Sequence, residues 1–163
     1  MTDLASRPTA ELFSLFANLM NELMARNIIR STNNPVADYA EYLVSRALHL
    51  TLNGMSTAGY DAEDDMGRRY QIKSRRLTPK NRSTHLGQMR GLDQKKFAFL
   101  VGVRFREDFT VERAVVIPHE VVMGIAKYHK HTNSWDIHLS DTVCCLTGVV
   151  DITERIDDVQ RQI

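Results

Sequence analysis

The chain has 163 residues, of which 43% are apolar, 25% charged and 7% aromatic. This size and composition predict a single globular domain, residues 1–163, and exclude a disordered or fibrous protein. The longest stretch without Asp, Glu, Lys or Arg, residues 47–60, is shorter than the about 20 apolar residues that a membrane span needs, so no membrane partner is expected. Cys144 and Cys145 are neighbours, which excludes a disulfide framework and favours a cytoplasmic location.

The formal net charge of +1 hides an uneven distribution of charge. Residues 68–96 hold ten Lys and Arg and a single acid, Asp93, and so carry a net charge of +9. The rest of the chain holds 11 basic and 19 acidic residues, a net charge of −8. A basic segment on an acidic body is typical of a surface that follows a phosphate backbone, although a solvated basic loop is the alternative.

Two helices are predicted before the first strand. Apolar residues recur at three-and-four spacing from Leu12 to Met24, within an N-terminal segment of residues 1–33, and this stripe is expected to lie in the core. Thr9 or Ser6 is the expected cap. A second helix is predicted after Asn34-Pro35, ending at Asn53-Gly54. Its expected inner stripe is Val36, Tyr39, Ala40, Leu43, Ala47 and Leu50.

The pattern then becomes alternating, which indicates strands. Residues Ala58–Glu63 and Arg68–Arg75 predict a hairpin around a turn at residues 64–67. The polar, basic segment Arg76–Gly91 is predicted to be a long loop, or a loop with a short helix. The apolar run Phe97–Phe105 predicts a strand buried on both faces.

The remaining segments complete an α/β pattern. Thr110–Ile117 predicts a partner strand, followed by a helix at Pro118–Tyr128 and a short strand at Trp135–Leu139. A final helix is predicted at Ile152–Gln162, within a C-terminal part formed by residues 118–163. This order of elements predicts an α/β fold in which helices flank a mixed sheet.

The hairpin could gather the groups of a metal site. Side chains alternate along a strand, so Gln71 and Lys73 share a face. Asp61 joins that face if it pairs opposite Arg69 or Gln71, whereas a register shifted by one residue would separate it. Carboxylate and amide oxygens suit Mg²⁺, and a neighbouring lysine can orient or deprotonate an attacking water. The backbone carbonyl of Ile72 is a further candidate ligand.

The succession of Asp61, a turn and Gln71-Ile72-Lys73 resembles the PD-(D/E)XK nuclease superfamily. In that superfamily an Asp on one strand precedes Glu-x-Lys, or sometimes Gln-x-Lys, on the next strand, and a preceding helix often contributes a Glu. Glu41 stands at that position here. The resemblance covers roughly residues 34–117, which it implies form the catalytic core of a restriction-endonuclease-like fold.

The resemblance also implies roles for these residues. Asp61 would be the principal metal ligand, with Gln71 and the Ile72 carbonyl as auxiliary ligands and Lys73 as the catalytic cation. Glu41 would be a catalytic or metal-binding carboxylate, although helices routinely carry a Glu beside the core stripe. The implied cofactor is Mg²⁺, which Mn²⁺ can replace. Gln71 departs from the commoner Glu and removes one negative charge from the site.

These observations predict a Mg²⁺-dependent DNA endonuclease of restriction type that cuts double-stranded DNA as a homodimer, because one active site cuts one strand. The alternatives are a catalytically inert nucleic-acid-binding module, which Gln71 favours, and a scaffold with a basic loop. The histidines near residue 130 lack metal-ligand spacing and predict an exposed loop. The expected phosphate contacts are Arg75, Arg76, Lys80, Arg82 and Arg90, and the expected base contacts are Asn81, Ser83, His85 and Gln88.

Overall fold

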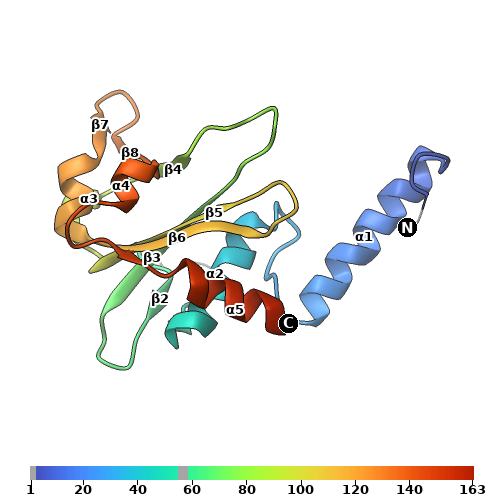
Figure 1. Ribbon diagram of the computed structural model, residues 1–163, viewed down its shortest axis with the longest axis horizontal. Helices are drawn as coiled ribbons and strands as arrows, with labels where there is room; N and C mark the ends of the chain where they lie inside the picture. Colours follow the sequence, from blue (N-terminus) through green and yellow to red (C-terminus); the bar gives the residue numbers. More distant parts are fainter. Residues whose placement is uncertain (1–2, 55–58) are drawn as a thin grey trace.

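A computed structural model describes residues 3–54 and 59–163, and Figure 1 shows the arrangement of its elements. The first helix, α1, covers Thr9–Ala25, and α2 covers Val36–Leu48, directly after Pro35 as predicted. The predicted end of the second helix at Asn53-Gly54 is wrong. His49 adopts a left-handed conformation with a φ of 54°, and this ends α2 at Leu48.

A mixed sheet forms the centre of the fold, as predicted. Among the described residues its strand order is β1-β2-β3-β5-β6-β9. Strands β3 and β5 are parallel, and every other neighbouring pair in this sheet is antiparallel. Its strands are β1 (Thr51–Leu52), β2 (Ala62–Glu63), β3 (Arg69–Arg76), β5 (Phe99–Phe105), β6 (Val111–Pro118) and β9 (Val150–Asp151).

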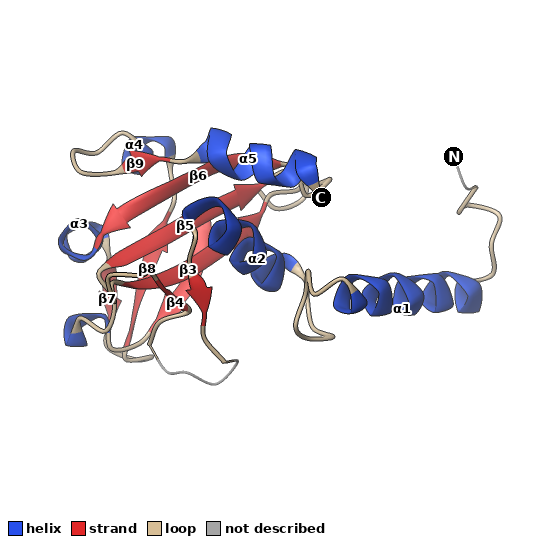
Figure 2. Cartoon of the chain, turned by 90° about the horizontal axis from the view of Figure 1, so that it is seen from below, coloured by secondary structure: helices blue, strands red, loops and turns tan. Residues whose placement is uncertain are grey.

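Helices α2 and α5 (Thr153–Gln162) pack together over one face of this sheet (Figure 2). Alternate residues of β3 and β5 point toward them, so Ile72 and Val103 share one apolar core with Leu43 of α2 and Ile156 of α5. Strand β5 is buried on both faces, as its apolar run predicts. The predicted final helix is confirmed, and it packs on the sheet through Ile156.

The opposite face is covered by a small second sheet and by α3 (His119–Ile125). Leu86 and Leu139 from the region of the second sheet join Leu100 and Ile117 in a second core cluster. Gly102 of β5 lies under this sheet, where an added Cβ would be 2.9 Å from Leu139 Cδ2. The second sheet has the order β4 (His85–Met89), β8 (Ser134–His138) and β7 (Lys127–His129).

The second sheet corrects two predictions. The segment Arg76–Gly91 is not a loop throughout, because β4 occupies its C-terminal part. A register shift between His85 and Gln88 and a positive φ at Gly87 interrupt the alternation that would reveal this strand in the sequence. The predicted helix Pro118–Tyr128 ends at Ile125, and β7 follows it.

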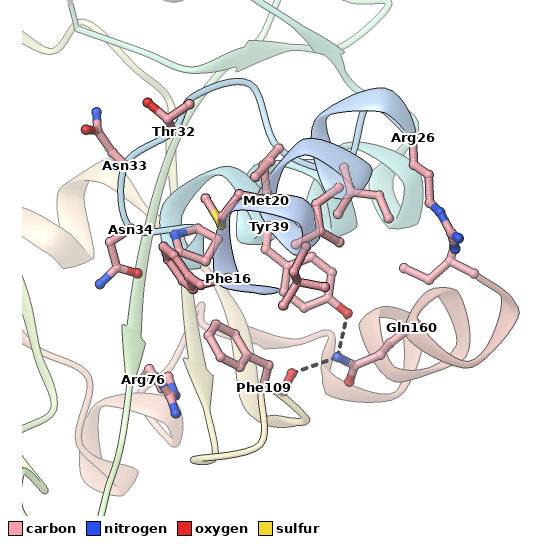
Figure 3. Close-up of a pocket in the computed structure, with 16 residues that line it drawn as sticks. Phe16, Met20, Arg26, Thr32, Asn33, Asn34, Tyr39, Arg76, Phe109 and Gln160 are labelled. Carbon is pink, nitrogen blue, oxygen red and sulfur yellow. Dashed lines mark hydrogen bonds between the residues drawn. The ribbon is translucent and has the colours of Figure 1, made fainter. Parts of the chain in front are cut away.

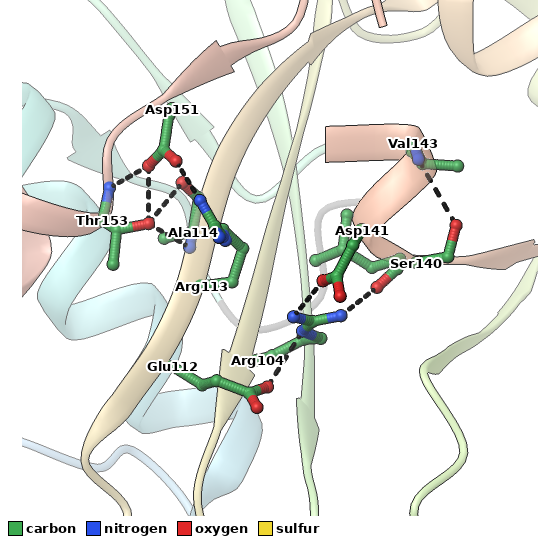
Figure 4. Close-up of polar contacts among 10 residues, drawn as sticks. Arg104, Glu112, Arg113, Ala114, Ser140, Asp141, Val143, Asp151 and Thr153 are labelled. Atoms are coloured by element: carbon green, nitrogen blue, oxygen red, sulfur yellow. Dashed lines mark hydrogen bonds and ion pairs between the residues drawn. The ribbon is translucent and has the colours of Figure 1, made fainter. Parts of the chain in front are cut away.

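Buried Arg104 ties the central sheet to the segment after β8 (Figure 4). Its Nη1 donates a hydrogen bond of 2.8 Å to the carbonyl of Leu139. Its Nη2 lies 2.8 Å from a carboxylate oxygen of Asp141, the first residue of α4 (Asp141–Cys144), and its Nε lies 3.0 Å from a carboxylate oxygen of Glu112 on β6. A short 3₁₀ turn at residues 92–94 precedes β5, and Ser140 caps α4.

The predicted position of the first apolar stripe in the core is wrong. Helix α1 extends away from the rest of the chain (Figures 1 and 2). Met20 is buried, but Phe13 and Phe16 are 71% and 57% exposed. The two cysteines are free thiols, Cys144 half-buried and Cys145 exposed. A helix able to cross a bilayer is not found in the part of the chain that the structure describes.

Candidate active site

Asp61 lies where the ladder between β2 and β3 ends. The last paired residues are Ala62 and Tyr70, and the Asp61 N–H donates to the carbonyl of Tyr70 at 2.8 Å. The Asp61 carboxylate then takes the place of the next strand residue, accepting a 2.6 Å hydrogen bond from the N–H of Ile72. This substitution explains why the predicted strand Ala58–Glu63 is reduced to β2; Ala58 itself lies outside the described residues.

Gln71 also contacts this carboxylate, since its Nε2 donates a hydrogen bond to Asp61 Oδ2. The structure therefore brings Asp61 and Gln71 together. Within a strand, the N–H and C=O of one residue point toward the same neighbouring strand. Because the Ile72 N–H faces Asp61, the Ile72 carbonyl faces the same edge. A half-turn of the Gln71 amide would bring its Oε1 to the same place as the Asp61 carboxylate and the Ile72 carbonyl, so that three oxygen atoms could bind a metal ion.

The surroundings of Asp61 raise its pKa above the usual range. Burial is the largest cause, and it is opposed by the hydrogen bond from Ile72 and by the positive charges of Lys73 and Arg30. The pKa of Glu41 is also raised, first by burial and then by the negative charge of Asp61, while Arg30 acts in the opposite direction. Two partly buried carboxylates thus share a region that would be stabilised by an added cation.

Glu41 approaches this region from α2, and it is held by an ion pair with Arg30. The Arg30 guanidinium also donates to the carbonyl of Asn53 at 2.7 Å, and the backbone N–H groups of Arg30 and Ser31 donate to Asp38, each at 2.8 Å. Within the described residues, neither a hydrogen bond nor an ion pair joins Glu41 directly to Asp61. Sequence analysis missed Arg30, because no motif links it to Glu41 and only the fold brings the two together.

Gln71 and Lys73 point to the face that the second sheet covers, and both line a cavity of about 190 Å³. Gln88 and Arg90 line the same cavity from the region of β4. Lys96, which the sequence analysis did not single out, contributes another ammonium group from the segment before β5. Three cations, Lys73, Arg90 and Lys96, therefore border a cavity next to the Asp61 carboxylate.

The other predicted nucleic-acid contacts lie in or beside the loop between β3 and β4. Lys80, Asn81 and Arg82 are exposed there. The loop folds back on β3, since Arg75 Nε donates to the carbonyl of Ser83 at 3.2 Å. Lys80 and Arg82 thus add exposed positive charges in the loop that joins the two strands bordering the cavity.

Two predicted contacts are engaged elsewhere. Arg76 points to the opposite face of β3, where its guanidinium lies 4.3 Å from the ring centroid of Phe109 and donates to the carbonyl of Glu107. His85 lies 3.3 Å from a carboxylate oxygen of Asp136, and its ring is tilted by 47° against that of His138 within the second sheet. Neither side chain is free to contact nucleic acid without leaving these partners.

The donor set around Asp61 is compatible with Mg²⁺, which is commonly held by one or two carboxylates, further oxygens and waters. No group of three or more His, Cys, Asp or Glu that could hold a metal occurs within residues 3–54 and 59–163, so a site here would depend on amide and carbonyl oxygens. Comparison with protein-family models and with curated proteins found no match for this chain.

Proposed function

We propose that the chain is a Mg²⁺-dependent DNA endonuclease with a restriction-endonuclease-like fold. The observation that carries this proposal is the convergence of the Asp61 carboxylate, the Gln71 amide and the Ile72 N–H at one strand edge, beside a cavity bordered by Lys73, Arg90 and Lys96. Carboxylate and cation chemistry of this kind is what phosphodiester hydrolysis requires. The two free thiols are compatible with a cytoplasmic location.

The residues divide the chemistry between them. Asp61, the Gln71 amide oxygen after its half-turn, and the Ile72 carbonyl would hold Mg²⁺, which when bound polarises the phosphate and lowers the pKa of a coordinated water. Lys73 would orient that water or stabilise the negative charge of the pentavalent transition state. Arg90 and Lys96 would bind the scissile phosphate or its neighbour. Arg30 would hold Glu41 beside the site.

The DNA would lie across the cavity and the loop between β3 and β4, which carries the exposed Lys80 and Arg82. Phosphate contacts from this loop would position the duplex, and the exposed side chains of Gln88 and Asn81 would reach base edges. One such site cuts one strand, so cleavage of both strands requires two copies of the chain. We therefore include a homodimer and double-stranded DNA in the proposal.

Incubation with supercoiled plasmid in Mg²⁺, Mn²⁺ or EDTA tests this proposal. We expect metal-dependent nicking or linearisation that Lys73→Ala abolishes. Arg155→Ala is the matched control, because it removes an exposed positive charge from α5, on the opposite face of the sheet. Cleavage that persists in Lys73→Ala, or that continues in EDTA, would contradict the proposal.

One observation favours a second candidate, an inert nuclease-fold protein that binds nucleic acid. The Gln71 amide donates to Asp61 through its nitrogen, so these two side chains satisfy each other without a cation. In that case the plasmid assay would show binding that weakens with salt and no cleavage in any metal. The same experiment therefore separates the two functions.

A further inference from the structure

Helix α1 carries an apolar face that its own chain only partly covers. Besides Phe13 and Phe16, Leu15 and Leu19 are 40% and 56% exposed. Together these four side chains present roughly 400 Å² of apolar surface. An isolated helix of this length is marginal in water, so a helix that stands away from the domain needs a packing partner.

The same helix borders a wide apolar groove of about 810 Å³ (Figure 3). Phe16, Leu19, Met20 and Leu23 of α1 form one wall, and Tyr39 and Phe109 lie opposite. Gln160 stabilises the opposite wall, donating to the Tyr39 hydroxyl at 2.8 Å and to the carbonyl of Phe109 at 2.7 Å. The exposed stripe thus continues into the groove through Phe16 and Leu19.

The sequence of α1 is self-complementary in an antiparallel arrangement. With Phe16 facing its own copy, residue i lies opposite residue 32 − i. Phe13 then meets Leu19, and both side chains are exposed, while Leu12 lies opposite Met20, which its own chain already buries. Glu11 meets Asn21, so that charged residues of like sign do not face each other. This symmetry is what a twofold interface requires, because each contact is made twice.

We propose that α1 is the dimerisation element of this protein. The occupant of the groove is the N-terminal half of α1 from a second copy, with Phe16 of both copies next to the twofold axis. Antiparallel pairing brings Phe13 of the second copy alongside Leu19, which is exposed and lines the groove.

The area that a stable dimer buries supports a contact that uses both the exposed stripe of α1 and the groove. A stable interface buries about 800 Å² per partner, and the helical stripe alone supplies roughly half of that. The groove wall around Tyr39 and Phe109 would supply the remainder. This inference concerns the oligomeric state and does not depend on nuclease activity.

Light scattering and analytical ultracentrifugation of the full chain at micromolar concentration test the inference. We expect the wild-type protein to have twice the chain mass of 18.6 kDa. Phe16→Glu and Phe16→Lys should each be monomeric, because like charges would meet at the axis, with at least about a hundredfold rise in the dimer dissociation constant. Asn18→Glu, which adds the same charge on the polar face of α1, should remain dimeric.

Mixing Phe16→Glu with Phe16→Lys provides the decisive measurement. Because residue 16 faces its own copy, the mixture should form a heterodimer while each variant alone stays monomeric, and circular dichroism should show that both variants are folded. A monomeric wild-type protein would overturn the inference. So would a dimer that survives Phe16→Glu, or a mixture that fails to associate.

Discussion

The Asp61 carboxylate completes the hydrogen bonding of β3 and is also the proposed metal ligand. It accepts the Ile72 N–H that a strand carbonyl would otherwise take, and it accepts the Gln71 amide. Burial nevertheless disfavours its charge and raises its pKa. A residue in this position is sensitive to one added or removed charge, which leads to two predictions.

The first prediction concerns Gln71→Glu. The change places a second carboxylate against Asp61, so in EDTA the two negative charges repel and the melting temperature should fall. The same pair should bind Mg²⁺ more tightly, so addition of Mg²⁺ should raise the melting temperature of the variant more than that of the wild type. Differential scanning fluorimetry with and without Mg²⁺ measures both effects.

Gln162→Glu is the control for this prediction, because it adds the same charge at the exposed end of α5. It should change neither the melting temperature nor the response to Mg²⁺. An equal response to Mg²⁺ in wild type and Gln71→Glu would show that residue 71 does not reach the ion.

The second prediction concerns the pH dependence of stability in EDTA. Because the pKa of Asp61 is raised in the folded state, this carboxyl binds a proton more tightly in the folded protein than in the unfolded chain just above the ordinary value of 3.8. The Asp61 contribution to the free energy of unfolding therefore declines as pH rises through the window between that value and the raised pKa. Above the window, ionised Asp61 is a net cost, because it lowers the free energy of unfolding.

Asp61→Asn should remove this cost and should also bring the pKa of Glu41 closer to its ordinary value, since the charge of Asp61 helps to raise it. We expect the variant to be at least as stable as the wild type near neutral pH, and its free energy of unfolding to rise relative to that of the wild type as pH increases through this window. Urea denaturation from about pH 4 to neutrality measures the profile. A variant whose free energy of unfolding falls relative to that of the wild type as pH rises would contradict the assigned direction.

At the scale of elements, β5 determines how closely the second sheet approaches the first. Gly102 allows the close approach, because a Cβ there would lie 2.9 Å from Leu139 Cδ2 and 3.2 Å from Leu86 Cδ1. Arg104, two residues further along the same face, stabilises this contact by donating a hydrogen bond to the carbonyl of Leu139. Strand β5 thus supplies both Gly102, which allows the second sheet to pack closely, and Arg104, which hydrogen-bonds to the segment that follows that sheet.

Gly102→Val should force this interface apart. We expect the free energy of unfolding to fall by about 1–3 kcal/mol through overpacking. Gly124→Ala in α3 is the control, because an added Cβ at Gly124 has no neighbour within 4 Å and alanine is the better helix former. Urea denaturation should find the control at least as stable as the wild type; an equally stable Gly102→Val would show that the sheets separate without cost.

Arg104→Met tests the polar anchor. It removes a buried guanidinium and leaves the carbonyl of Leu139 without this donor, so we expect a loss of about 3 kcal/mol in the free energy of unfolding. Asp141→Asn removes only an exposed partner, 81% accessible, and should cost less than about 0.5 kcal/mol. If both substitutions lowered the free energy of unfolding equally, the ion pair with Asp141 would account for the loss, and the buried hydrogen bond to Leu139 would not.

At the scale of the whole molecule, positive charge is concentrated in residues 68–96 while the rest of the chain is acidic. Lys80 and Arg82 are exposed in the loop between β3 and β4, and Arg90 and Lys96 border the cavity beside Lys73. Attraction to DNA would therefore be local, and the near-neutral total predicts weak non-specific binding at physiological salt.

Lys80→Ala and Arg82→Ala should each weaken DNA binding on all sequences and reduce the slope of log affinity against log salt by about 1. Arg155→Ala, on the opposite face, should leave the slope unchanged. Fluorescence anisotropy with a short duplex over a salt series measures these slopes. If all three variants share the wild-type slope, DNA does not follow the loop.

Local sequence patterns predicted much of the architecture. Sequence patterns located α5, the strands β3, β5, β6 and β8 and the start of α2 to within a few residues, because their apolar residues follow the period of a helix or a strand. The same patterns did not reveal β4 and β7, whose few residues carry an irregular register or no alternation. They also misassigned α1 to the core, since an apolar stripe specifies a partner surface but not the molecule that provides it.

The sequence by itself determined which chemical groups are available: a carboxylate, an amide and an ammonium on adjacent strands, within a basic segment. Only the tertiary structure decided how they are arranged, bringing Arg30 to Glu41 and Lys96 to the cavity, and turning Arg76 to the other face of β3. The physical reason is the range of the interactions. Periodicity and turn chemistry act between near neighbours in the chain, whereas these charges meet through sheet register and layer packing that distant segments build together.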